Sequence, residues 1–138
     1  MTVERAPALQ SAVYSRLTWL LAAEHPDDLG VPVFDHPAPP GTGVHLRLEN
    51  FTILPTEAKN SEWAIHNFSV RVFEDPHAKH SGLQRVRVLQ AKIKHNLAGW
   101  VPLGRSGEIR QQSVTAGVGE GDVPEGISRF SVTLYEEN

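Results

Sequence analysis

The stretch VHLRLENFTILPTEAKNSEWAIHNFSVRVF, residues 44–73, decides the fold. Apolar side chains alternate with polar ones in both of its halves, which is typical of strands that are buried on one face. The apolar positions are Val44, Leu46 and Leu48 in the first half and Phe68, Val70 and Val72 in the second. Residues 54–61 contain a proline and separate the halves, so the two strands are predicted to form a hairpin with this segment as its loop.

The apolar phase changes once in each half of this stretch. After Asn50 the first strand continues with Phe51 and Ile53 on the other phase. In the second strand Trp63 and Ile65 lie in one phase and the later apolar residues lie in the other. Because a slip of one residue moves a side chain to the opposite face of a sheet, two matched changes predict a bent hairpin or facing β-bulges.

A helix is predicted on each side of the hairpin. Residues 6–23 carry apolar side chains at helical spacing, and Pro7 suits the first turn of a helix. The second helix closes at Ala98 and Gly99, with Gly99 placed as a C-terminal cap, and Ser81 or a residue near it could cap its start. Its apolar stripe is formed by Leu83, Val86, Leu89, Ile93 and Leu97.

Three further strands complete the pattern. Residues 31–35 form a short extended piece, and Pro32 confines it to a sheet edge or a strand start. Residues 108–118 and 126–135 form two strands around an acidic loop that contains glycine. The predicted order is α-β-β-β-α-β-β. The fold class is therefore α+β, with an antiparallel or mixed sheet of about five strands and two amphipathic helices packed on one face.

Length and composition limit the possible functions. The 138 residues suit a single domain that spans residues 1–138. The net charge of −3 argues against a dedicated nucleic-acid binder, although it allows contact with DNA that passes nearby. The chain has no cysteine, so disulfides and thiolate chemistry are impossible. The longest apolar run, residues 20–23, is far too short to cross a bilayer, and we expect a soluble protein without a membrane partner.

The chemical motifs in the sequence are weak. His77 and His80 are three residues apart and could share a metal, but no third ligand is obvious beside them. His45 and His66 could approach each other across the hairpin. Residues 104–107 read Gly-Arg-Ser-Gly, which lacks the spacing of a nucleophile elbow. The glycines of residues 117–121 are followed by acids and a strand, which does not suit a phosphate loop. We expect no enzyme activity, no metal and no cofactor.

Exposed polar side chains are the better candidates for function. The second helix carries cations on its polar face, and the two hairpin loops carry mostly acids, so the chain offers complementary patches for assembly. The candidate assembly contacts are Thr56, Glu57, Lys59, Asn60, Arg85, Arg87, Lys92, Glu120, Asp122 and Glu125.

Four segments together resemble the tail-terminator, or tail-completion, proteins of long-tailed phages and gene transfer agents. They are ALQSAVYSRL at residues 8–17, VPVFD at 31–35, IHNFSVRVF at 65–73 and GISRFSVTL at 126–134. The resemblance covers nearly the whole chain and rests on element order and residue type. Two segments depart from it. Residues 55–60 read PTEAKN where the family usually has a run rich in Thr and Asp, and residues 76–81 are rich in histidine.

The resemblance implies a structural virion protein at the neck, or tail top, that is assembled in the host cytoplasm. Such proteins form a homohexameric ring that caps the tail tube, stops its polymerisation and joins it to the head connector. The implied partners are further copies of the chain, the major tail tube protein and a head–tail connector or stopper protein. DNA only passes through the lumen, and no catalytic residues carry over.

Two alternatives remain open at this level. The first is another head–tail joining protein, such as a head-completion or connector protein. The second is a small-ligand-binding or catalytic α+β domain, which predicts a pocket where His45, His66 or His95 meets carboxylates.

Overall fold

The structure, a computed structural model, describes residues 5–21, 30–54, 63–75, 83–119, 121 and 123–135. It contains two helices and five strands in the predicted order. The elements are α1 (Ala6–Leu20), β1 (Val33–Phe34), β2 (His45–Leu54), β3 (Trp63–Phe73), α2 (Gln84–Leu97), β4 (Arg110–Val118) and β5 (Pro124–Tyr135).

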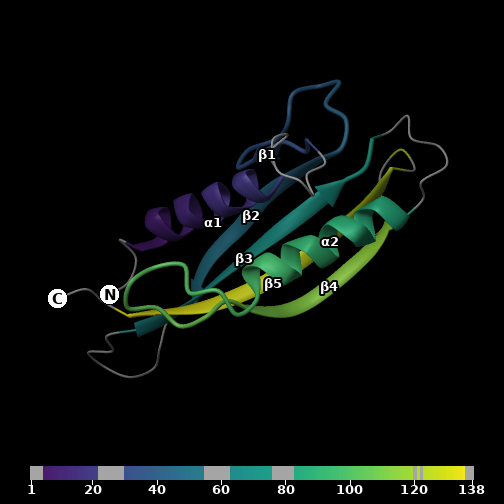
Figure 1. Cartoon of the computed structure of the whole chain (residues 1–138). Coiled ribbons are helices and arrows are strands. Elements are labelled where there is room, and N and C mark those ends of the chain that lie inside the picture. Colours follow the sequence, from purple (N-terminus) through teal and green to yellow (C-terminus); the bar gives the residue numbers. More distant parts are fainter. Residues whose placement is uncertain are drawn as a thin grey trace.

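The five strands form one mixed sheet in the order β1-β2-β3-β5-β4. The pairing of β1 with β2 is parallel, and the other three pairings are antiparallel. Both helices lie on the same face of the sheet, with α1 toward β1 and β2 and α2 toward β5 and β4 (Figure 1). This confirms the predicted α+β class, and none of the described residues forms a helix on the opposite face.

The helix ends follow from local sequence. α1 starts beside Pro7 and ends at Leu20, and the predicted extension to residues 22–23 lies outside the described residues. α2 has Leu83 at its start without a side-chain cap, and Ser81 also lies outside the described residues. Gly99 follows the end of α2 with a φ of +86°, a conformation that favours glycine and that supports the predicted helix stop.

The core lies between the helices and the sheet. Its largest side chains include Phe68 of β3 and Phe130 of β5, which stack at 5.5 Å between ring centroids. Phe51 of β2 stacks on Phe68 from the other side at 5.3 Å. The apolar stripe predicted for the second helix supplies Val86, Leu89, Ile93 and Leu97, all buried. The three stacked rings therefore connect the central strands beneath the helices.

Of the two predicted phase changes, the one in β2 is a β-bulge and the one in β3 is not. β2 has a register shift between Glu49 and Thr52, where Asn50 adopts a φ of +57°. The extra residue keeps Phe51 on the helix-covered face, so this phase change was read correctly. β3 has no such shift, because its ladder with β5 is continuous from Trp63 to Phe73. The apolar phase changes in β3 because Trp63 is an apolar side chain on the uncovered face of the sheet.

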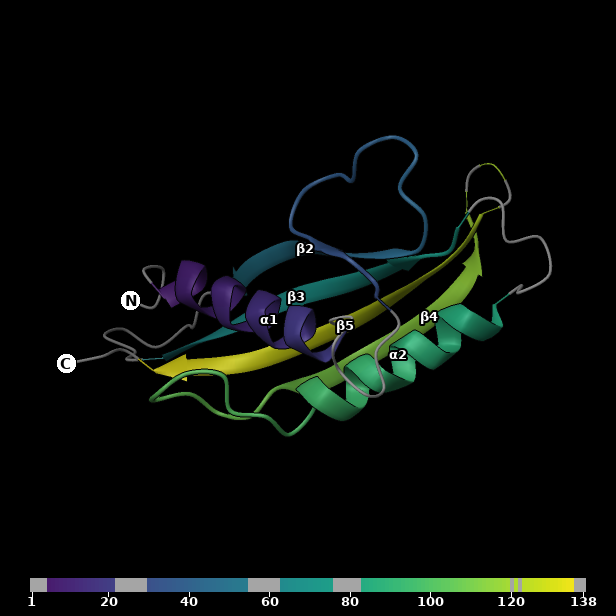
Figure 2. The ribbon, with the colours of Figure 1, turned by 45° about the horizontal axis from the view of Figure 1, so that its top comes forward.

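Strand bounds differ only slightly from the prediction. β5 starts at Pro124, two residues before the expected position, and β4 starts at Arg110, two residues after it. β4 also has a register shift between Gln111 and Ser113, which the sequence pattern did not indicate. The segment between β1 and β2, which includes Pro37, Pro39 and Pro40, projects from the sheet as a loop (Figure 2).

Candidate assembly surface

The uncovered face of the sheet is divided into a charged half and an aromatic half. In the charged half, Arg71 of β3 lies between two acids, with Nε 2.7 Å from Glu49 Oε1 and a terminal nitrogen 3.2 Å from Glu125 Oε1. Arg47 binds the second oxygen of Glu49 at 2.9 Å. These pairs run across β2, β3 and β5, and they satisfy most of the charge of this half inside the chain.

Aromatic rings lie beside this ion-pair network. His45 stacks on Phe73 at 4.7 Å, and the guanidinium group of Arg47 lies 5.1 Å from the centre of the Phe73 ring. The His45 Nδ1–H donates to the carbonyl of Gly43 at 2.8 Å. A cation over an aromatic face is attracted by the ring quadrupole, so the network and the rings support each other.

A hollow of about 400 Å³ opens at this end of the sheet, lined by His45, Arg71, Phe73, Glu74 and Glu125 among others. This is where the small-ligand alternative would have its site, since a histidine meets carboxylates here. The carboxylates are engaged, however. Glu125 binds Arg71, while Glu74 accepts from the backbone N–H of Asp75 and lies 3.4 Å from Arg85. The glutamates that line the hollow therefore already have partners within the chain.

The aromatic half, which we call the aromatic patch, consists of Leu54, Trp63, Ile65 and Tyr135. Leu54 pairs with Ile65 across β2 and β3, and Trp63 pairs with Tyr135 across β3 and β5. Leu54, Trp63 and Tyr135 are 49%, 41% and 40% exposed. Large apolar side chains gathered on an uncovered face mark an interaction site, and Trp and Tyr are the residues that most often dominate binding.

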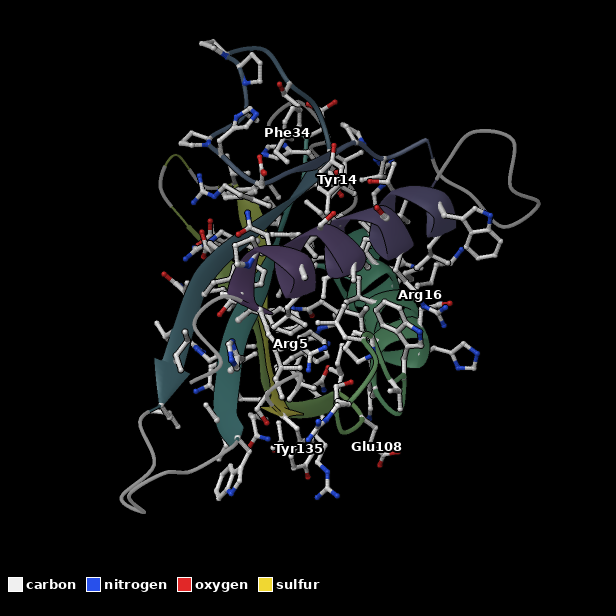
Figure 3. The ribbon with its side chains drawn as sticks, turned by 90° about the vertical axis from the view of Figure 1, so that its left-hand side faces the viewer. Arg5, Tyr14, Arg16, Phe34, Glu108 and Tyr135 are labelled. Atoms are coloured by element: carbon white, nitrogen blue, oxygen red, sulfur yellow. The ribbon has the colours of Figure 1, made fainter. Side chains whose placement is uncertain are left out.

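Arg5 fixes the strand end beside the aromatic patch. Its guanidinium group donates to the carbonyls of Gly104, Arg105 and Tyr135. Figure 3 shows Arg5 reaching from the start of α1 toward Tyr135 at the end of β5. These three hydrogen bonds to backbone carbonyls tie the end of β5 to the start of the first helix.

The structure distributes the candidate assembly contacts unevenly. Thr56, Glu57, Lys59, Asn60, Glu120 and Asp122 lie outside the described residues. Arg85 and Glu125 make ion pairs within the chain, with Glu74 and Arg71 respectively. Arg87 is exposed on α2 and Lys92 is half-buried there. Sequence reasoning missed the aromatic patch, although the apolar side chains at Trp63 and Ile65 on the polar phase of β3 were its signal.

The histidines do not form a site in the described part of the chain. His45 pairs with Phe73 on the uncovered face, whereas His66 lies among core side chains opposite Ile53, so the expected approach of the two histidines was wrong. His77 and His80 lie outside the described residues. Among the residues described, no group of three or more His, Asp or Glu side chains could hold a metal ion. None of the described helices is long and apolar enough to cross a membrane.

His66 gives the fold a dependence on pH. Burial lowers the pKa of His66 below its usual 6.5, and the positive charge of Arg5 lowers it further. Below pH 6.5 the unfolded chain binds a proton that the folded chain does not bind, so the free energy of unfolding falls as the pH falls toward the folded pKa. We expect the loss between pH 7.5 and pH 5.5 to be smaller in His66→Gln than in the unmodified chain, by urea denaturation. Equal losses would show that His66 titrates normally.

Comparison with known proteins was made for sequence and for fold. No family model matches the chain, and no curated protein matches it either. A chain from the solved structure titled "Virion of native gene transfer agent (GTA) particle" has a similar fold, with a TM-score of 0.75 and 22% sequence identity. The match covers 96% of this chain and 98% of that chain. The fold of this chain is thus that of a chain found in a gene transfer agent particle.

Proposed function

We propose that the chain is a structural virion protein that forms a ring at the top of a tail tube, stops its polymerisation and joins it to the head connector. The observation that carries this is the fold shared over nearly the full length with a chain of a gene transfer agent particle. The tail-terminator role comes from the resemblance of the four sequence segments and goes further than the fold comparison.

The surface of the chain supports a role in assembly. In the described part of the chain, no helix covers the second face of the sheet. The aromatic patch on this face lies where the segment between β2 and β3 leaves and rejoins the sheet. We propose that the patch faces the tail tube protein together with the candidate contacts of that segment, which are Thr56, Glu57, Lys59 and Asn60. In the charged half of the face, Arg47, Arg71, Glu49 and Glu125 already pair with one another, which favours the aromatic patch as the contact.

The ring and its capping activity can be tested together. Purified chain, alone and mixed with the major tail tube protein of its particle, is examined by native mass spectrometry and electron microscopy. We expect rings, and we expect tubes that stop growing when the rings are added. A strict monomer under both conditions would overturn the proposal. Rings that bind portal-side proteins and leave tube growth unchanged would favour the other class of head–tail joining protein.

The aromatic patch makes a specific prediction for this experiment. Trp63→Ala removes a half-exposed indole from the centre of the proposed tube contact. Truncation of an interfacial Trp commonly costs about 2 kcal/mol or more, which corresponds to roughly 30-fold weaker binding. We expect the ring concentration needed to stop tube growth to rise by about that factor. Trp19→Ala is the matched control, because Trp19 is 60% exposed but lies on α1, on the other side of the sheet. Equal effects of both variants would exclude the patch as the tube contact.

A further inference from the structure

The sheet has two unlike edges. β4 forms one edge with nine residues and pairs with β5 alone among the strands that the structure describes. β1 forms the other edge with two residues and follows Pro32, which has no N–H to donate. A long strand with unpaired N–H and C=O groups is a template for another chain unless something covers it. Within the described residues, no strand pairs with the outer side of β4, so this edge is available to another chain.

A groove of about 370 Å³ runs between α2 and β4. Its lining includes the cations Arg87 and Lys94 and the apolar Ala91 and Val114, and no carboxylate. Val114 is 48% exposed. Within the described residues, the buried Oε1 atom of Gln111, which also lines the groove, has no hydrogen-bond partner. The groove thus suits an occupant that is acidic, partly apolar and able to donate a hydrogen bond.

The opposite edge of the sheet carries a negative charge. The described residues 30–35, which lead into β1 and just past it, contain no Lys or Arg and one acid, Asp35. Asp35 directly follows β1, and its side chain is 48% exposed. By contrast, residues 84–118 of α2, its connection and β4 contain a single acid, Glu108, and the cations Arg85, Arg87, Lys92, Lys94, Arg105 and Arg110.

Apolar surface accompanies Asp35 on the α1–β1 side. Tyr14 is 38% exposed and lies on the same side of the molecule as Phe34 of β1 (Figure 3). Arg16, in contrast, points toward α2, where it donates to the carbonyl of Asn96 and stacks on Trp100. The cation of α1 is thereby held away from the β1 edge.

From these features we propose that the α2–β4 groove of one copy receives the α1–β1 side of the next copy. The two surfaces lie at opposite edges of a five-stranded sheet, roughly 19 Å apart at about 4.8 Å per strand, so they cannot meet within one copy. Contacts between unlike surfaces repeat head to tail and form a closed ring when the rotation between copies closes. This inference supplies the subunit contact that the proposed function requires.

Two blocking variants test the contact. Val114→Lys blocks the groove, and Asp35→Lys reverses the charge of the opposite edge. In a ring of one variant, every contact contains the substituted residue. We expect association at least about tenfold weaker, so that each variant is a monomer at concentrations where the unmodified chain forms rings. Thr52→Lys, at an exposed position of β2 on the uncovered face and away from both contact surfaces, is the control and should keep the ring. Circular dichroism and thermal melting confirm that all three variants are folded.

An equal mixture of the two blocking variants is the decisive sample. One intact contact can form between them, because the acidic side of Val114→Lys meets the groove of Asp35→Lys. A contact between the groove of Val114→Lys and the acidic side of Asp35→Lys would contain both substitutions and should not form. Native mass spectrometry should therefore show a one-to-one complex of twice the 15.2 kDa chain mass, and nothing larger.

The outcomes separate this contact from the proposed function. Rings that persist in both variants, or two monomers that fail to pair in the mixture, would overturn the head-to-tail contact while leaving a ring possible. If Val114→Lys still forms rings and these no longer stop tube growth, the groove binds the tube protein and the inference is wrong. If the two variants pair as expected but rings of the unmodified chain never affect tube growth, the tail-terminator role would be overturned instead.

Discussion

Phe68→Ala is expected to lower the free energy of unfolding by about 3–5 kcal/mol, the usual cost of truncating a buried Phe. Phe68 is 1% exposed at the centre of the middle strand, and its ring lies between Phe51 and Phe130. Its loss leaves a cavity that three separate strands border, and none of them can move in without breaking a ladder. At roughly 4 °C per kcal/mol, the melting temperature should fall by about 12–20 °C.

The matched control lies on the same strand. Phe73→Ala removes the same side chain from the uncovered face, where the ring is only half-buried and packs on His45 and the two arginines. We expect it to cost less than half as much, because solvent can fill the space that the ring leaves. Urea denaturation of the two variants measures the difference. Equal costs would mean that the stack of three rings is not the centre of the core.

Local patterns predicted the elements because the spacing of apolar residues reports which face is buried. Leu9, Val13 and Leu17 recur at helical spacing and are all buried on α1. Pro32 predicted a sheet edge or a strand start, and β1 is an edge strand that begins directly after Pro32. The strand order was not predictable in the same way, since it places β5 between β3 and β4. That order depends on pairing between residues far apart in sequence, such as Phe68 with Phe130.

The candidate surfaces were harder to predict for a physical reason. A strand pattern with apolar residues on its polar phase has two explanations, a bulge or an apolar patch on the second face. Asn50 and Phe51 are the first case and Trp63 and Ile65 are the second, and only the pairing with a neighbouring strand separates them. Arg5 gave no local signal at all, because its acceptors lie about 100 and 130 residues away.

Gly126→Ala is expected to destabilise the chain by about 2–4 kcal/mol, although it adds a single methyl group. Gly126 is buried in β5 beneath α2. A Cβ atom there would lie 2.2 Å from Gln90 Nε2 and 2.8 Å from Val86 Cγ1, so both neighbours would have to move. Overpacking typically costs about 1–3 kcal/mol. Gln90 would also lose the hydrogen bond that it donates to the carbonyl of Thr115 at 2.8 Å, worth about 1 kcal/mol.

Gly117→Ala is the matched control, because it places the same methyl group in the neighbouring strand with nothing within 4 Å of it. A Gly without a positive φ in a strand should tolerate alanine or gain stability by about 0.4–1 kcal/mol. Gln90→Ala in the Gly126→Ala background should recover part of the loss, since it removes the atoms that clash. If Gly126→Ala and Gly117→Ala unfold at the same urea concentration, α2 does not rest on β5 as closely as the structure indicates. Because the same glycine sets how near α2 lies to β4, Gly126→Ala should also weaken ring formation through the groove, which Gly117→Ala should not do.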